Sequence, residues 1–417
     1  MLGGGEVQGG ELSAARQAAG VSPTNEIGVL FCCARTRMDA TTGARLRGLL
    51  QKGVDWDVLV GAAFKNGLLP LLYLNLKSCA SDLVPAPVAA HLRELFLSNA
   101  RRNLLLADEL VNLLGLFQAN AVDALPFKGP ALAELVYGDP TLRQFADLDI
   151  LIREADFWKA KGLLEAHGYR QEPPLTNAQT ANILRHQYNV SFVRDGGRIV
   201  ELHWRFTSPD FSLPVDMERL WTRLDARPLQ GVIIQALRAE DLLLVLCVHG
   251  SKHLWERIVW LCDVAELING REDMDWQYTL RQAHEFGNER ILFLSLLLAH
   301  DILRATIPEE VHKLAYGDAA ARSLAEQIRR RCHAGGGTPG IYESLRFLLE
   351  SRANFRDKLR YCRSAVTPTE RDLSLLPLPA FLSPLYYLFR PVRMLAEYSL
   401  PLLKSLTYAR RGWRSGD

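Results

Sequence analysis

Two carboxylates stand at alternate positions in an otherwise apolar stretch of the chain. Asp147 and Asp149 alternate with Leu148 and Ile150 in the run FADLDILI. Successive side chains of a β-strand point to opposite faces, so this run predicts a strand with two acidic groups on one face and apolar groups on the other. Neighbouring carboxylates repel each other, and a divalent cation between them relieves the repulsion.

A third carboxylate occurs in the run RIVELHWRF, where Glu201 and His203 share one face and the apolar residues around them share the other. If the two predicted strands are neighbours, three carboxylates meet, as two-metal phosphoryl transfer requires. The sequence therefore predicts that Asp147, Asp149 and Glu201 hold Mg²⁺ or Mn²⁺. His203 could orient Glu201 or contact a substrate, and it could equally be a hydrogen-bonded structural histidine.

Basic groups precede the acidic strand. Lys128-Gly129 lies between a predicted strand (124–127) and a predicted helix (130–137), where backbone N–H groups and the helix dipole can bind phosphate. Lys128 could contact triphosphate oxygens as a point charge, and Arg143 could do so through its planar guanidinium. For either residue the alternative is an ordinary solvated or salt-bridged side chain.

Short apolar runs separated by turn residues from Asp123 to Phe206 predict an α/β region. Its expected elements are strands at 124–127 and 145–152, helices at 130–137 and 156–167, and a hairpin of strands 189–194 and 198–206. Leucines at three- and four-residue spacing before and after this region predict helices. The expected fold is thus an α/β (α+β) core with a small mixed sheet, flanked by all-helical regions at its N- and C-terminal sides.

The expected organisation has five parts. They are a Gly-rich flexible N-terminus (1–40), an N-terminal helical subdomain (41–120), the α/β core (121–210), a C-terminal helical domain (211–365) and an apolar, basic tail (366–417). The tail mixes aromatic and arginine side chains, which suits peripheral contact with a membrane or docking on its own domain. Its five prolines argue against a spanning helix.

The run AEDLLLVLCVHGSKHLWERIVWLCDVAELI reads as a helix that ends before Gly270. On one helix, five residues would lie close to one polar stripe, with Lys252 and Arg257 beside it: His249, His253, Glu256, Trp260 and Asp263. This stripe could contact base, phosphate or acceptor, or it could be a polar seam between domains. A zinc site on the two histidines is disfavoured because no HExxH pattern accompanies them.

The overall composition excludes several classes of partner. The 417 residues include 49 basic and 47 acidic ones, and no basic stripe with interleaved aromatics marks a nucleic-acid surface. Seven scattered cysteines without a Cys-x-x-Cys pair are typical of a reducing compartment. The first residues lack the basic and apolar regions of a signal peptide, so a cytoplasmic location is expected.

The ordered motifs LPFKG, DLDILI and VELHW resemble an uncharacterised bacterial nucleotidyltransferase family of the DNA-polymerase-β-like nucleotidyltransferase superfamily, over much of residues 50 to 300. The matching positions are Lys128, Gly129, Tyr137, Arg143, Asp147, Asp149, Glu201, His203 and Trp204. The resemblance implies the minimal nucleotidyltransferase fold, Mg²⁺ and an NTP donor, with the two aspartates as metal ligands and Glu201 as ligand or general base. Better-known members carry Gly-Ser at the phosphate turn, where this chain has Lys-Gly.

The expected activity is metal-dependent transfer of NMP from an NTP to a hydroxyl of a sugar, metabolite or protein. One alternative is a catalytically degenerate protein that binds nucleotide or acts as a scaffold, with the tail at a membrane surface. A glycosyltransferase, which also uses D-x-D, is disfavoured because about eighty helical residues precede the Lys-Gly turn and no nucleotide-binding α/β unit begins the domain.

Overall fold

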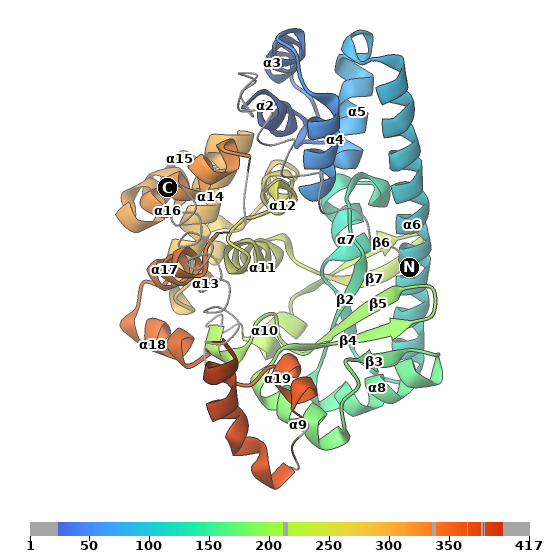
Figure 1. The fold of residues 1–417 in the computed structure, drawn as a ribbon, viewed down its shortest axis with the longest axis vertical. Coiled ribbons are helices and arrows are strands. Elements are labelled where there is room, and N and C mark those ends of the chain that lie inside the picture. Colours follow the sequence, from blue (N-terminus) through green and yellow to red (C-terminus); the bar gives the residue numbers. More distant parts are fainter. Residues whose placement is uncertain are drawn as a thin grey trace, which may run out of the picture.

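A small mixed sheet lies among helices on all sides in the computed structural model (Figure 1). The structure describes residues 24–211, 216–335, 339–364, 366–376, 378 and 380–394. In this view the long helix 86–119 runs along the sheet, the other N-terminal helices lie above it, and most helices of the C-terminal part gather to its left. The predicted fold class, an α/β core between helical regions, is confirmed.

The N-terminal part is helical. Its helices are α2 (Thr24–Cys33), α3 (Ala40–Gln51), α4 (Trp56–Lys65), α5 (Leu69–Cys79) and α6 (Ala86–Ala119). The 34-residue α6 runs along the sheet (Figure 1). Its buried stripe, Leu106, Leu110, Leu113 and Phe117, recurs at three- and four-residue intervals and packs against the sheet in one apolar cluster.

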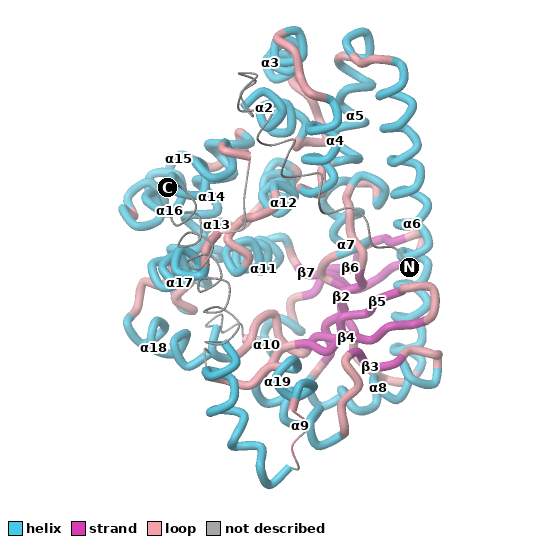
Figure 2. Tube along the Cα trace, in the orientation of Figure 1, coloured by secondary structure: helices cyan, strands magenta, loops and turns pink. Residues whose placement is uncertain are grey.

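The core contains five strands in the order β1-β2-β5-β4-β3 (Figure 2). Its elements are β1 (Ala124–Pro126), α7 (Gly129–Leu132), a π-helical turn (Ala133–Tyr137), β2 (Asp147–Ile152), α8 (Phe157–Ala166), β3 (Arg170–Glu172), α9 (Asn177–His186), β4 (Asn189–Arg194) and β5 (Arg198–His203). Strands β2 and β5 are parallel, and the other pairs are antiparallel. The predicted strands and the hairpin are confirmed, whereas β3 and α9 were not predicted.

The two faces of the sheet differ as the alternation predicts. Leu148 and Ile150 of β2 and Val200 and Leu202 of β5 are fully buried in the apolar cluster that includes α6 and α8 residues. The opposite face carries the acidic side chains. Burial of one complete face fixes the register of both strands, because a shift by one residue would turn the apolar side chains out.

The C-terminal part is mostly helical. Its elements are α10 (Met217–Trp221), β6 (Leu224–Leu229), β7 (Val232–Leu237), α11 (Ala239–Lys252), α12 (Ile258–Asn269), α13 (Trp276–Glu285), α14 (Glu289–Leu303), α15 (Glu309–Gly317), α16 (Ala319–His333), α17 (Ile341–Glu350), α18 (Phe355–Ser364) and α19 (Glu370–Leu375). The hairpin β6–β7 departs from the helices expected after residue 210. Its Leu229 and Ile234 side chains are buried with the sheet core.

The N-terminal part of the chain also differs from expectation. Residues 24–33, predicted to be flexible, form α2, whose Val29, Leu30 and Cys33 side chains are fully buried. They join the large apolar cluster that extends through α11, α12, α14 and α16. Residues 1–23 of the predicted flexible stretch lie outside the described residues, and residues 34–39 connect α2 to α3.

The run predicted as one long helix is two helices, and this prediction is corrected. Between α11 and α12, Leu254 and Trp255 adopt positive φ angles of 52° and 54°. The Trp255 ring folds back onto Gly250, where a Cβ would lie 2.4 Å from the ring. The apolar spacing continues on both sides of this bend, so periodicity alone did not reveal it.

The described part of the tail docks on the core. The buried Asp372 carboxylate pairs with Arg390 (3.1 Å) and Arg393 (2.6 Å), and Gln179 of α9 donates to the carbonyl of Leu373. Docking on its own chain is therefore observed for residues 366–376 and 380–394. Across the described residues, no helix combines the length and apolarity needed to cross a membrane.

Candidate active site

The acidic face of β2 and β5 faces α11 and α12 across a cleft of about 340 Å³, a size within the range of small-molecule sites. We call it the acidic cleft. Its lining comprises Lys128, Arg143, Gln144, Phe145, Ala146, Asp147, Asp149, Tyr188, Asn189, Glu201, His203, Phe206, His249, Lys252, His253, Arg257, Val259 and Trp260. Nine of the ten residues that the sequence nominated thus line one space, and Gly129 is the exception.

Parallel pairing of β2 with β5 brings the carboxylates together. Asp149 and Glu201 are direct register partners, and Asp147 lies on the same face of β2. Oδ1 of Asp149 lies 3.1 Å from Nζ of Lys128 and 3.1 Å from Nε2 of His203. The same His203 nitrogen is 3.3 Å from Oε2 of Glu201. A lysine and a histidine therefore hold the acidic groups in the metal-free protein.

The two aspartates have opposite titration behaviour. Burial, together with the nearby charges of Asp149 and Glu201, raises the pKa of Asp147 to about 6. Burial would also raise the pKa of Asp149, but Lys128 and His203 outweigh it, and the pKa of this carboxyl is well below its usual range. Among the described residues, Asp149 has salt bridges to Lys128 and His203, whereas Asp147 has none.

The two cationic partners of Asp149, Lys128 and His203, have raised pKa values. Burial favours the neutral forms of Lys128 and His203, yet the carboxylates outweigh it and raise the pKa of both groups. Burial would likewise raise the pKa of Glu201, but its interaction with His203 lowers it. Asn189 on the neighbouring β4 also donates to Glu201 over 2.9 Å, so this carboxylate is held ionised.

The donor set fits a divalent cation. Ligand atoms of Asp149, Glu201 and His203 all lie within 4.8 Å of one another, and Asp147 adds a carboxylate on the same face. The carboxylate oxygens suit Mg²⁺ or Mn²⁺, and the imidazole suits a softer ion. Nδ1 of His203 is buried without a hydrogen-bond partner among the described residues. The sequence nominated His203 as an orienting or substrate-contacting group, and the geometry adds it to the candidate metal ligands.

Gly129 positions the acidic strand from the outside of the cleft. It has a φ of +56°, and a Cβ at this position would approach the Asp147 carbonyl to 3.0 Å. Glycine permits both the positive φ and the close approach. Helix α7 has only four residues, and Gly129 does not line the cleft. Its role in phosphate binding remains a prediction.

Arg143 is engaged with another carboxylate. Its Nε and Nη2 each lie 2.8 Å from the oxygens of Asp263, and Tyr137 donates to the same carboxylate over 2.6 Å. All three side chains are buried. This cluster ties the segment before β2 to α12. Asp263 engages Nε and Nη2 of Arg143, so the predicted contact with phosphate would have to use Nη1.

The bend between α11 and α12 gathers imidazole and indole rings at the cleft. The ring centroids of His249 and His253 are 4.7 Å apart, and both lie within 5.3 Å of Trp260. Burial, with nearby cations, lowers the pKa of His253 to about 3 and that of His249 well below its usual range, so both rings are neutral. Neutral rings suit stacking and hydrogen bonding to an uncharged group.

The predicted stripe is only partly confirmed. His249, His253 and Trp260 line the cleft, but Glu256 is exposed and Asp263 is buried with Arg143. The bend turns these residues to different sides, which a continuous helix could not do.

Tyr188 is a cleft residue that the sequence did not predict. Tyr188 lies under Lys252, whose Nζ is 4.2 Å from the ring centroid and hydrogen-bonds to the hydroxyl. Burial lowers the pKa of Lys252 to about 8. Arg257, expected beside the polar stripe, lies in the bend and donates to the Lys65 carbonyl. A tyrosine just before a strand gave no spacing signal in the sequence.

A comparison with protein families matches the model of uncharacterised nucleotidyltransferases to residues 52–304. No curated protein and no solved structure matches the chain. The matched stretch contains the whole acidic cleft, with both carboxylate strands and the bend between α11 and α12. The chain belongs to this family of uncharacterised nucleotidyltransferases.

Proposed function

We propose that the protein transfers NMP from an NTP to a hydroxyl acceptor, using a divalent metal held by Asp147, Asp149 and Glu201. The observation that carries the proposal is the parallel pairing of β2 and β5, which makes Asp149 and Glu201 register partners beside Asp147. Three carboxylates on one sheet face, opposite basic side chains, match what phosphoryl transfer demands of a site.

Different residues of the cleft bind the triphosphate, contact the base or acceptor, and orient the carboxylates. Lys128, Lys252 and Arg257 line the cleft and supply positive charge to the triphosphate. The neutral His253 and Trp260 rings offer a face for the base or the acceptor. A bound Mg²⁺ or Mn²⁺ supplies charge neutralisation at the phosphates and lowers the pKa of the acceptor hydroxyl. His203 orients Glu201 and Asp149 through its Nε2 contacts.

The acceptor can be a sugar, a small metabolite or a protein side chain, so the experiment uses cell extract as the source of acceptors. Four α-³²P-labelled NTPs are incubated with the protein, cell extract and Mg²⁺ or Mn²⁺. The product is then compared for wild type, Asp147→Asn and the Asp147→Asn/Asp149→Asn double variant. Label transfer that requires both metal and carboxylates supports the proposal and isolates the acceptor. Equal transfer by the double variant contradicts it.

A catalytically degenerate nucleotide-binding protein is the second candidate. It is favoured by one observation: Lys128 and His203 already neutralise Asp149, as a metal would. Equilibrium dialysis separates the two cases. Metal-dependent NTP binding supports the transferase, whereas NTP binding that is unaffected by EDTA and unaccompanied by label transfer supports the degenerate protein.

Peripheral membrane contact through the tail stays a proposal for the residues beyond 394. Flotation of the intact protein with anionic vesicles tests it, and truncation after residue 394 should release any bound protein without loss of nucleotide binding. Absence of flotation by the intact protein ends this idea.

A further inference from the structure

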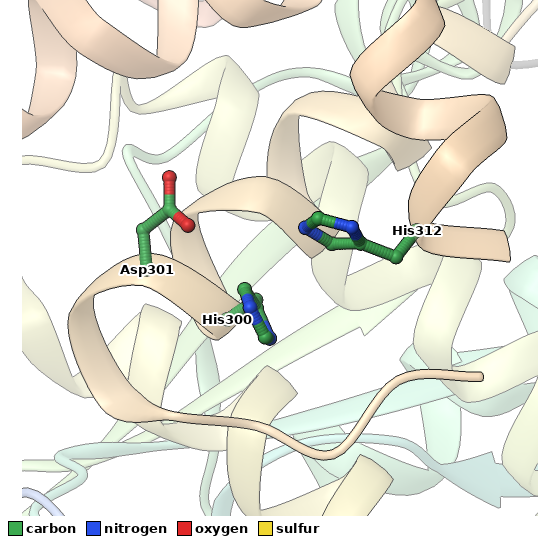
Figure 3. A group of neighbouring side chains, drawn as sticks. All are labelled: His300, Asp301 and His312. Atoms are coloured by element: carbon green, nitrogen blue, oxygen red, sulfur yellow. The ribbon is translucent and has the colours of Figure 1, made fainter. Parts of the chain in front are cut away.

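A second group of potential metal ligands lies outside the acidic cleft. His300 and Asp301 at the end of α14 and His312 in α15 surround a common space (Figure 3). Their ligand atoms all lie within 4.8 Å of one another. None of the three lines the acidic cleft, and α14 and α15 lie well apart from β2 and β5 in Figure 1.

The His300 ring is oriented for coordination. Its Nδ1 lies 3.2 Å from the carbonyl oxygen of Ala305, and only a protonated Nδ1 can donate to that oxygen. In the neutral ring the lone pair is then on Nε2. Arg304 ends α14 in a left-handed conformation (φ 62°, ψ 36°), and this turn leads the chain to the Ala305 carbonyl. Metal-binding histidines are commonly fixed by such a bond from their other nitrogen.

The two remaining groups are free to bind. The His312 ring lies 4.5 Å from the His300 ring, at an interplanar angle of 54°. Asp301 is exposed, and within the described part of the chain its carboxylate forms no hydrogen bond or ion pair. An unneutralised carboxylate thus stands beside two imidazoles at the junction of two helices (Figure 3).

We propose that His300 Nε2, His312 and Asp301 bind a divalent transition metal of the zinc class and link α14 to α15. A tetrahedral ion with bonds of ~2.0 Å needs ligand atoms ~3.3 Å apart, and small side-chain rotations close the observed gaps. Two imidazoles and one carboxylate leave a fourth position for water. This donor set favours zinc over Mg²⁺, which prefers oxygen ligands and keeps much of its hydration shell.

The test measures zinc bound by the full-length protein in excess Mg²⁺, by equilibrium dialysis. Compared with wild type, His300→Gln and His312→Gln should each bind one equivalent of zinc less. His91→Gln is the matched control, because His91 is an exposed helical histidine outside both ligand groups, and it should bind as wild type does. Zinc should also raise the Tm of wild type and of His91→Gln by more than it raises the Tm of His312→Gln.

Asp149→Asn distinguishes this site from the acidic cleft, where zinc could also bind. Under the proposal this variant retains the equivalent that depends on His300 and His312. The proposal is overturned if both histidine variants bind as much zinc as wild type. It is equally overturned if only Asp149→Asn loses zinc, because the ion would then lie in the cleft. Failure here leaves the proposed nucleotidyl transfer untouched.

Discussion

Replacing Asp147 by asparagine should stabilise the metal-free protein at neutral pH. Burial and the neighbouring carboxylates raise the pKa of Asp147 from 3.8 to about 6, so its ionised form is disfavoured in the folded state. One pKa unit corresponds to about 1.36 kcal/mol, which gives a cost of about 3 kcal/mol above pH 6. Because solvent screens this partly exposed carboxylate, we expect Asp147→Asn to raise the free energy of unfolding by about 1–3 kcal/mol.

The pH dependence follows from the sign of the shift. Because the folded-state pKa lies above the unfolded one, the folded protein binds the Asp147 proton more tightly. The cost is absent below pH 3.8, grows between pH 3.8 and 6, and is complete above pH 6. The advantage of Asp147→Asn should therefore appear at neutral pH and vanish near pH 4.

The chemically identical change at Asp149 should have the opposite effect. It removes the carboxylate that pairs with both Lys128 and His203, and it leaves buried cations with less compensation. Breaking a buried pair in this way costs roughly 3–5 kcal/mol. The two variants are thus matched controls for each other.

The assay is urea unfolding in EDTA, followed by tryptophan fluorescence from pH 4 to pH 8. The reasoning is refuted if Asp147→Asn is less stable than wild type at pH 8, or if both variants change stability in the same direction. Added Mg²⁺ should stabilise wild type more than Asp147→Asn, because the ion relieves the same repulsion.

Three further outcomes are expected. Asp263→Asn should lower the free energy of unfolding by about 3–5 kcal/mol, since it leaves a buried guanidinium without its counter-charge; an unchanged urea midpoint would contradict this. Gly129→Ala should lower the free energy of unfolding by about 1–2 kcal/mol because of its positive φ, which urea unfolding measures. It should also slow turnover, measured by steady-state kinetics, because the added Cβ displaces Asp147. Wild-type stability together with wild-type turnover would exclude the steric argument. Near pH 8 to 9, NTP binding should be accompanied by proton uptake, because the nearby phosphate raises the pKa of Lys252 from about 8. Calorimetry in two buffers of different ionisation enthalpy measures the number of protons taken up. Equal proton uptake by Lys252→Met would point to another group.

The sequence predicted the parts of the site that depend on local alternation. A period of two in DLDILI and RIVELHW fixed which side chains share a face, and burial of Leu148 and Val200 confirms it. The pairing of these strands was an assumption at that stage, because no local signal links residues about fifty positions apart. The structure supplies it through the register of Asp149 with Glu201.

Other features could not be predicted from the sequence because contacts between distant parts of the chain determine them. The bend after α11 depends on Trp255 packing onto Gly250, and the apolar spacing hides it. The ion pair of Arg143 with Asp263, 120 residues away, has no local signal in the sequence, and contact of Arg143 with phosphate stays a prediction. The Gly-rich start hid α2, whose burial depends on the neighbouring α3, α4 and α5 and also on α14 and α16 from the other end of the chain.

That shared burial sets a constraint on how the chain is synthesised. Helix α2 lies in one apolar cluster with α14, roughly 250 residues later, while the core between them can pair its own strands. At translation rates of ~5–20 residues per second, α2 waits about 10–50 s on the ribosome for these partners. During that interval α3, α4 and α5 can already pack against α2, so the apolar surface left exposed is the part of α2 that α14 and α16 later cover.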